Sequence, residues 1–344
     1  MKILLTGHHG YIGSVCGPLL AEAGHEVVGL DTGLYRGCDL ASAPMPSTAS
    51  LLLDVRDVRP EQLDGFDAIV HLAALSNDPI GDFSPELTRE INFESTVSLA
   101  RAARDAGVRR FVFSSSCSMY GASSDEAVDE SAPLKPLTAY AESKVLAEEA
   151  LAALAGPDFA PISMRNATAY GVSPRLRVDL VLNNLVGWAH TTGKVKIMSD
   201  GTPWRPLTHV EDIARASLAA VEASEDVIRG EAFNVGRNDE NYQVRQLGDI
   251  VQDVVPGSEV EYAGSGDPDP RSYRADFGKL ARAFPELELT WTARTGAEEL
   301  ASAYQAAGLT LDQFESDRFT RLKRLRALLE GGELDPTLRW REAA

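Results

Sequence analysis

The chain has 344 residues, 44% of them apolar, so it is long enough for about two domains and can bury a core. Its 33 Lys and Arg against 51 Asp and Glu give a net charge of −18, which argues against a broad surface for nucleic acid or anionic membranes. Three cysteines without CxxC spacing predict neither a disulfide framework nor a metal site. With no apolar run of ~18 residues and no signal-peptide core, we expect a cytoplasmic protein that does not enter membranes.

The first half of the chain alternates short apolar runs with segments of helical period. This rhythm is typical of βαβ units and predicts an α/β fold, a doubly wound parallel sheet with helices on both faces. Predicted strands cover residues 2–6, 26–30, 50–53, 68–72, 110–114 and 161–165. Predicted helices cover residues 12–23, 86–106 and 140–154, each followed closely by a glycine.

After residue 165 the rhythm loosens and proline and glycine recur. We expect helices at residues 210–223, 244–254, 276–284, 295–307 and 311–330. We therefore expect a first domain over residues 1–165 and a second, smaller α/β domain over residues 166–344, with a segment near 205–236 returning to the first. The basic second half of the last helix predicts a solvated face, and we assign it no function.

The first strand runs directly into TGHHGYIG, which places Gly7, Gly10 and Gly13 where a strand turns into a helix. The unpaired N–H groups of such a helix start, beside its positive dipole end, can bind a pyrophosphate that glycines allow to approach. Ordinary tight turns also use glycine, and the spacing differs from GxGxxG.

An acidic residue ends the second predicted strand. Asp31 follows Gly13 by 18 residues, where a carboxylate accepts hydrogen bonds from a ribose diol, which favours NAD. Arg36 nearby leaves NADP open. Asp54, after the third strand, is a candidate for the adenine end of the same cofactor; a loop cap is the alternative for both carboxylates.

Tyr140 and Lys144 lie four residues apart in LTAYAESKVLAEE and share one helix face. A neighbouring cation lowers the pKa of a phenol, and Thr138 as N-cap would place Tyr140 in the first turn, where the helix dipole favours negative charge. This pattern predicts a tyrosine general base. The alternative is an amphipathic helix with a half-buried tyrosine and a lysine that reaches solvent.

These motifs occur together with others in a fixed order. TGHHGYIG, Asp31, HLAAL, SSSCSMYG, YAESK and RPLTHVEDIA cover nearly the whole chain, which resembles an extended short-chain dehydrogenase/reductase of the nucleotide-sugar epimerase and dehydratase group. The resemblance implies a Rossmann domain that binds NAD, a nucleotide diphosphate sugar as substrate in carbohydrate biosynthesis, and a homodimer in which the helices at 86–106 and 140–154 pair across a twofold axis.

The resemblance also implies roles for individual residues. Tyr140 is the general acid/base, Lys144 holds the nicotinamide ribose and lowers the tyrosine pKa, and Ser116 hydrogen-bonds the reacting hydroxyl. The implied cofactor-binding residues are Gly7, Gly10, Tyr11, Ile12, Gly13, Asp31, Asp54, Val55, Leu72, Ala73, Ala74, Ser114, Tyr140 and Lys144. The implied substrate-binding residues are Ser76, Ser116, Cys117, Thr168, Asn183, Asn184, Arg205 and Arg271, with Arg205 on the diphosphate.

The two residues that follow Ser116 distinguish the reactions catalysed within the group. The 4,6-dehydratases carry an acidic pair there, whereas this chain has Cys117 and Ser118, so we expect an epimerase that acts at C4 through a transient keto sugar. A 4-keto reductase, an atypical dehydratase and a dinucleotide-sensing protein are the alternatives.

The group commonly has an asparagine where this chain has Thr168. This difference weakens the expectation that the protein recognises the sugar hydroxyls as other members of the group do. Arg175 and Arg177 add local positive charge; we expect them to be exposed to solvent, and the alternative is a contact with an acidic sugar or a phosphate.

Overall fold

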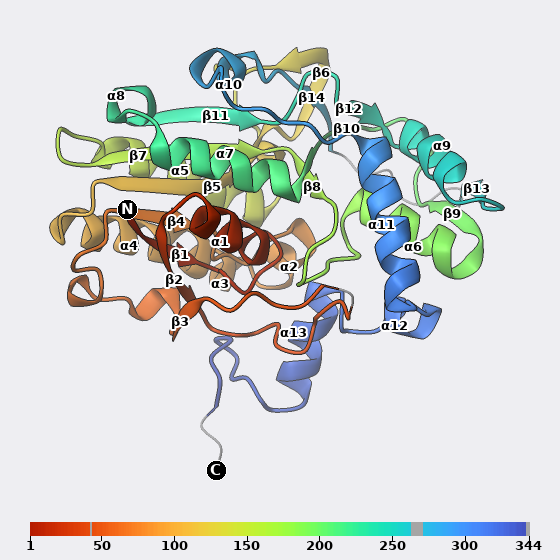
Figure 1. Cartoon of the computed structure of the whole chain (residues 1–344), viewed down its shortest axis with the longest axis horizontal. Coiled ribbons are helices and arrows are strands. Elements are labelled where there is room, and N and C mark those ends of the chain that lie inside the picture. Colours follow the sequence, from red (N-terminus) through yellow and green to blue (C-terminus); the bar gives the residue numbers. More distant parts are fainter. Residues whose placement is uncertain (42, 263–270, 342–344) are drawn as a thin grey trace.

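The computed structural model describes residues 1–41, 43–262 and 271–341. Figure 1 shows a large twisted sheet covered by helices on both faces, beside a smaller part in which α6, α9 and α11 gather. The large sheet is parallel and has seven strands in the order β11-β7-β5-β4-β1-β2-β3, so the doubly wound fold predicted from the sequence is confirmed. Its strands are β1 (Lys2–Thr6), β2 (Glu26–Asp31), β3 (Ala49–Leu52), β4 (Ala68–His71), β5 (Arg110–Ser116), β7 (Ala160–Asn166) and β11 (Glu231–Val235).

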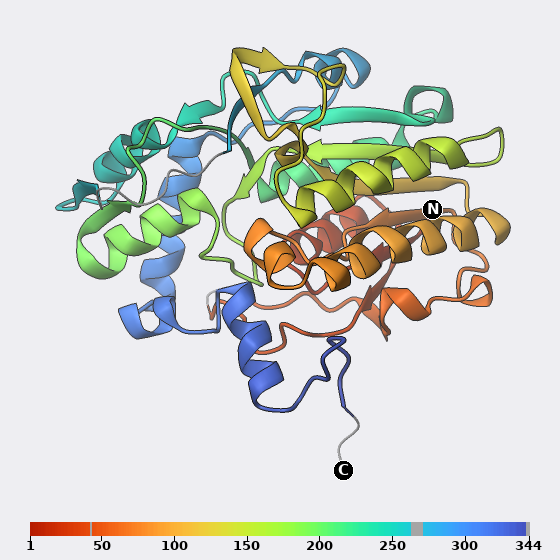
Figure 2. The ribbon, with the colours of Figure 1, turned by 180° about the vertical axis from the view of Figure 1, so that it is seen from behind.

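Side-chain alternation along the strands divides the core between the two faces of the sheet. Ile3 and Leu5 of β1 lie in one buried cluster with Leu20, whereas Leu4 lies in another with Leu99. The first face is covered by α1 (Gly13–Glu22) and α7 (Val210–Glu222), which pack on each other, and the second by α4 (Ser95–Asp105) and α5 (Ala139–Leu154), as Figure 2 shows from behind.

The shorter elements around this sheet include four helices and four single turns or irregular segments. They are α2 (Asp78–Phe83), α3 (Pro85–Arg89), α8 (Glu225–Ile228), α10 (Gly278–Ala283), η1 (Val55–Asp57), η2 (Pro60–Gln62), η3 (Glu90–Glu94) and η4 (Cys117–Tyr120). The strand β11 pairs with β7, so residues 231–235 complete the large sheet although they follow long after its other strands.

The second part is built around its own buried cluster, which includes Leu182, Leu247 and Leu300. Its helices are α6 (Val181–Thr192), α9 (Val244–Val254), α11 (Ala293–Ala307) and α12 (Leu311–Glu315). The last helix, α13 (Arg321–Glu330), packs instead in a separate buried cluster with Leu75 and Ile80. Small sheets hold the remaining strands: β8 (Thr168–Tyr170), β10 (Trp204–His209) and β12 (Asn241–Gln243) in one, β9 (Lys194–Ile197) with β13 (Glu259–Tyr262), and β6 (Ala122–Val128) with β14 (Ser272–Ala275). No helix in the described ranges is both long and apolar enough to span a membrane.

The predicted helix over residues 86–106 is interrupted by the π-helical segment η3. Asn92 explains the interruption, because its side chain leaves the helix to accept a hydrogen bond from the Leu75 N–H at 2.8 Å and to donate to the Ser143 hydroxyl at 3.2 Å. The π-helical turn therefore ties the segment after β4 to α5, and both of these contribute to the site described below.

The prediction of one helix over residues 311–330 was wrong, because α12 ends at Glu315 and α13 begins at Arg321. Tertiary contacts outweigh the helical period in between. Phe319 is buried in the cluster of the second part, its carbonyl accepts a hydrogen bond from the Val178 N–H at 3.1 Å, and Arg318 donates to the Asp39 carbonyl at 2.7 Å.

Candidate active site

A cavity of about 570 Å³ lies at the carboxyl ends of the parallel strands. Asp31 ends β2, Ser116 ends β5 and Asn166 ends β7, and all three line it. The second part closes the other side with residues that include Asn184 and Lys196. Ligands of open α/β sheets bind in such a crevice, where the strand order changes direction.

The glycine-rich turn forms one wall of this cavity. Gly7 has a φ of +71°, and a Cβ there would lie 2.8 Å from the Ala73 nitrogen. A Cβ at Gly13 would lie 2.2 Å from the Gly7 carbonyl oxygen, so this turn can be built only without that side chain. A diphosphate can approach this turn because its backbone carries no side chains at these glycines and α1 begins at Gly13. The turn is therefore suited to bind a dinucleotide.

The two carboxylates expected at the adenosine end both line the cavity. Asp31 accepts backbone hydrogen bonds from Gly33 at 2.7 Å and from His9 at 3.1 Å, which fix its orientation at the end of β2. Asp54 caps η1 and is held by Arg56, whose Nη2 lies 2.7 Å from Asp54 Oδ2. Both carboxylates therefore cap local backbone, as the alternative interpretation predicts. Each carboxylate oxygen can still accept a further hydrogen bond.

The start of α5 positions the tyrosine and the lysine. The Thr138 hydroxyl caps the helix by accepting the Ala141 N–H at 3.2 Å, which sets Tyr140 in the first turn. Lys144 is buried, its Nζ donates to the Ser114 carbonyl at 2.7 Å, and it lies 5.8 Å from the centre of the Tyr140 ring. Tyr140, Lys144 and Ser116 all line the cavity.

The protonation of this pair differs from the sequence expectation. Burial and the Asp78 carboxylate together raise the pKa of Tyr140 to about 12, although a hydrogen bond with Ser116 opposes the change. Burial lowers the pKa of Lys144 to about 7, against the effect of Glu148. Lys144 therefore does not lower the pKa of Tyr140, and burial shifts both groups toward their neutral forms.

Ser116 lies where β5 becomes the short helix η4. Its hydroxyl caps that helix by accepting the Ser118 N–H at 3.2 Å, and its oxygen lies 3.0 Å from Ser118 Oγ. One strand across, the Asn166 amide donates to Ser114 Oγ at 2.9 Å. The end of β5 thus presents hydroxyl groups to the cavity in fixed positions.

Cationic side chains gather at the other end of the cavity, where the second part closes it. Arg205 donates to the Trp204 carbonyl at 2.7 Å and to the Arg271 carbonyl, and Arg271 forms an ion pair with Asp78. Asp78 in turn accepts the Thr138 hydroxyl at 2.5 Å, which links the arginine pair to the start of α5. Ser76, Thr168 and Asn184, also expected to contact substrate, line the cavity.

Two expected substrate-binding residues lie outside the cavity lining. Cys117 is fully buried because the turn into η4 directs it inward, where its thiol donates to the Arg165 carbonyl at 3.0 Å. Asn183 is also fully buried, and its amide bonds the Gly171 N–H at 3.0 Å and the Arg177 carbonyl at 2.9 Å. Both side chains organise backbone rather than face a ligand.

Several residues that line the cavity were missed or misread in the sequence. Asn166 ends β7, a position that could have marked it, whereas Asp78 begins α2. Arg177 was expected in solvent but is buried, bonded to Asp179 at 3.0 Å, and lines the cavity. Arg321, in the supposedly solvated last helix, is also buried there, and no local pattern indicates this.

Comparison with known proteins places this geometry among relatives. The model of a family described as "NAD dependent epimerase/dehydratase family" matches residues 3–236. A UDP-glucose 4-epimerase of Corynebacterium glutamicum is 32% identical over 288 residues, covering 78% of this chain and 85% of the relative.

Two solved structures are similar over most of the chain. UDP-glucuronic acid 4-epimerase from Bacillus cereus, in complex with UDP-glucuronic acid and NAD, is 25% identical with a TM-score of 0.76, covering 89% of this chain and 99% of its own. The dTDP-glucose 4,6-dehydratase DesIV from Streptomyces venezuelae, with NAD bound, is 26% identical with a TM-score of 0.77, covering 91% and 100%.

Proposed function

Because the chain belongs to the NAD-dependent epimerase/dehydratase family, we propose that it is a nucleotide-sugar epimerase that inverts C4 through a transient keto sugar. It is an NAD-dependent enzyme of the short-chain dehydrogenase/reductase type. The observation that supports the proposal most is the convergence of Ser116, Tyr140 and Lys144 on the cavity that the glycine-rich turn also lines.

NAD fits this cavity along the large sheet. The turn at Gly7, Gly10 and Gly13, with Tyr11 and Ile12, would hold its diphosphate, and Asp31 and Asp54 its adenosine. When bound there, the nicotinamide would supply the chemistry of taking up a hydride from a sugar carbon and giving it back. The other residues expected to contact NAD also line this cavity; they are Val55, Leu72, Ala73, Ala74 and Ser114.

The reacting hydroxyl must lose its proton as its carbon loses hydrogen. Tyr140 takes that proton at its phenolic oxygen and returns it on re-reduction, while Ser116 orients the hydroxyl. A positive charge near the phenolic oxygen would favour this step, because burial and Asp78 together hold the pKa of Tyr140 at about 12. Lys144 retains two N–H bonds, beyond the one given to Ser114, with which it can hold ribose hydroxyls.

Epimerisation is favoured over dehydration by the residues after Ser116. Elimination of water needs an acid and a base beside the sugar, whereas Cys117 is buried and Ser118 is a hydroxyl. We place the nucleoside diphosphate sugar at the end with Arg205 and Arg271, so that residues 1–165 with 205–236 bind NAD and residues 166–344 bind the sugar nucleotide.

The test is incubation of the purified enzyme with a panel of nucleoside diphosphate sugars, followed by NMR and mass spectrometry of the products. An epimerase gives a product of unchanged mass that differs in configuration at C4, without net change in NAD. Loss of water identifies a dehydratase, and stoichiometric consumption of NADH a reductase. Recovery of every substrate unchanged would contradict the proposal.

We also propose that the enzyme is a cytoplasmic homodimer. Its free cysteines, Cys16, Cys38 and Cys117, are buried, which suits a reducing compartment. The helices expected to pair, α4 and α5, lie against each other on one face of the sheet. Sedimentation should give about twice the 37.1 kDa mass of one chain, and a single 37.1 kDa species would contradict the dimer.

A further inference from the structure

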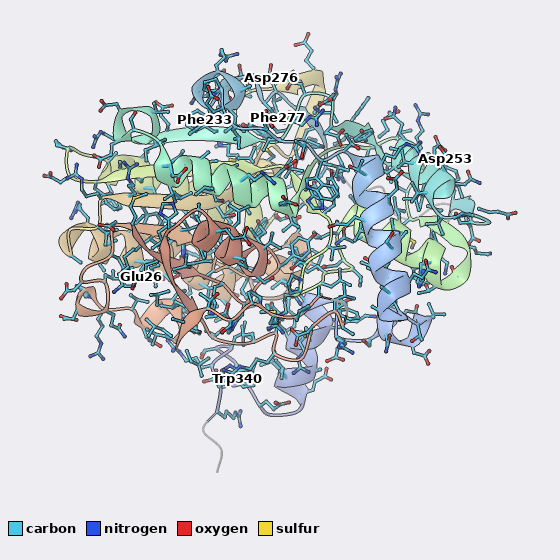
Figure 3. All side chains as sticks on the ribbon, viewed as in Figure 1. Glu26, Phe233, Asp253, Asp276, Phe277 and Trp340 are labelled. Atoms are coloured by element: carbon cyan, nitrogen blue, oxygen red, sulfur yellow. The ribbon has the colours of Figure 1, made fainter. Side chains whose placement is uncertain are left out.

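The C-terminal segment over residues 321–341 contributes to the wall of the cavity, although its sequence suggests only a solvated basic helix. Arg321 and Leu338 line the cavity. Trp340 donates its indole N–H to the Thr32 carbonyl at 2.7 Å, one residue beyond β2, and Figure 3 labels this side chain below the sheet. Arg56 donates to the Thr337 carbonyl at 3.0 Å. The segment is thereby attached to the loops that carry Asp31 and Asp54.

Arg321, the first residue of α13, is the least expected member of this segment. Its side chain is 2% exposed, and its Nη2 donates to the Arg175 carbonyl at 2.9 Å. Its Nη1 is buried without a partner, and within the described ranges no carboxylate lies within ion-pair distance of it. Burial lowers the pKa of Arg321 to about 10, which reflects this unbalanced environment.

The other arginines nearby are already neutralised. Arg177 is paired with Asp179, and Arg175 with Asp39. Arg321 instead lies over the Tyr35 ring, with its guanidinium carbon 4.2 Å from the ring centre. The Asp179 carboxylate, already paired with Arg177, offsets the charge of Arg321 only in part. Burying a charge is costly unless an opposite charge compensates it, so an anion bound beside this guanidinium would be stabilising.

The position of Arg321 indicates which anion this is. The Arg175 carbonyl that accepts its hydrogen bond belongs to a residue whose own Nε donates to the His9 carbonyl at 2.9 Å, within the glycine-rich turn. Arg321 is thus connected by one residue to the turn whose free N–H groups suit a diphosphate. A guanidinium presents two parallel N–H groups that match phosphate oxygens.

We propose that Arg321 binds the diphosphate of the dinucleotide, so that the C-terminal segment completes the cofactor site from outside the Rossmann sheet. The inference rests on the proposed placement of NAD in this cavity. Because the nucleotide sugar also carries a diphosphate, the experiment must separate the two sources.

The experiment measures dissociation constants of ADP, adenosine and UDP for nucleotide-free protein by calorimetry. In Arg321→Met we expect ADP to bind at least about tenfold more weakly, while adenosine and UDP change less than about twofold. Arg326→Met is the matched control, because Arg326 lies on the same helix but is exposed; all three constants should stay within about twofold.

Thermal unfolding without nucleotide supplies a second readout. If Arg321 serves to bind an anion, its replacement by methionine should leave the midpoint unchanged or raise it, because an uncompensated buried charge is removed. A merely structural arginine would lower the midpoint and leave ADP affinity unchanged. Should Arg321→Met not fold, Arg321→Gln, which keeps a donor for the Arg175 carbonyl, is measured in its place.

The inference is overturned if ADP binds the variant as tightly as it binds the wild type, or if UDP rather than ADP is weakened. Failure of the proposed function is a different result, in which the wild-type protein itself does not bind NAD.

Discussion

The protonation of two side chains on α5, Tyr140 and Lys144, decides whether this site can remove a proton. Tyr140 and Lys144 are placed as the YAESK pattern predicts, on one face of α5. The sequence does not reveal that burial shifts both pKa values toward the neutral forms, to about 12 for Tyr140 and about 7 for Lys144. Their placement on one helix face therefore does not by itself lower the pKa of the tyrosine.

Lys144→Met should change the pH dependence of stability in cofactor-free protein. The ordinary pKa of 10.5 applies to the unfolded chain and about 7 to the folded one, so protonation of Lys144 opposes folding. This penalty is complete below about pH 7 and disappears as the pH approaches 10.5. In urea titrations the variant should gain stability relative to wild type at pH 7 compared with about pH 9; a difference independent of pH would contradict the assigned shift.

Cys117 and Ser118 provide a contrast between a buried neighbour and a residue that lines the cavity. Burial raises the pKa of the Cys117 thiol, and the side chain lies outside the cavity lining. Cys117→Ala should lower the unfolding midpoint by leaving a small void but leave KM for the nucleotide sugar unchanged, whereas Ser118→Ala should alter KM. Steady-state kinetics with both variants test this, and a raised KM in Cys117→Ala alone would reverse the assignment.

At the scale of elements, the βαβ rhythm predicts the sheet because alternating apolar strands and amphipathic helices determine it locally. All six predicted strands form within two residues of the predicted bounds. What fails is the continuity of helices over residues 86–106 and 311–330. There, Asn92 and Phe319 make long-range contacts that periodicity does not contain.

Gly13→Ala should disrupt the turn between β1 and α1. The new Cβ would lie 2.2 Å from the Gly7 carbonyl oxygen, so we expect NAD affinity to fall by at least about tenfold and the unfolding midpoint to drop. Gly17→Ala is the control within the same helix, because its Cβ would meet Leu5 Cδ2 at an ordinary 3.4 Å. Fluorescence titration with NADH compares the two variants, and equal effects would show that the turn has no special role.

For the whole molecule, a net charge of −18 excludes broad anion-binding surfaces but leaves room for a local cationic site. The cavity lining includes Arg177, Arg205, Arg271 and Arg321. The last comes from a segment far from the sheet in sequence. Motifs predict the residues near β1, β2 and β5, whereas the residues contributed by the second part and the C-terminal segment depend on tertiary placement.

The central claim is tested most directly by Tyr140→Phe, measured for both turnover and cofactor binding. The phenolic oxygen is removed while the ring and the NAD contacts remain. The account predicts that epimerisation falls by at least about 10²-fold, while the dissociation constant of NAD stays within about twofold of wild type. Undiminished turnover in Tyr140→Phe, with NAD still bound, would contradict it.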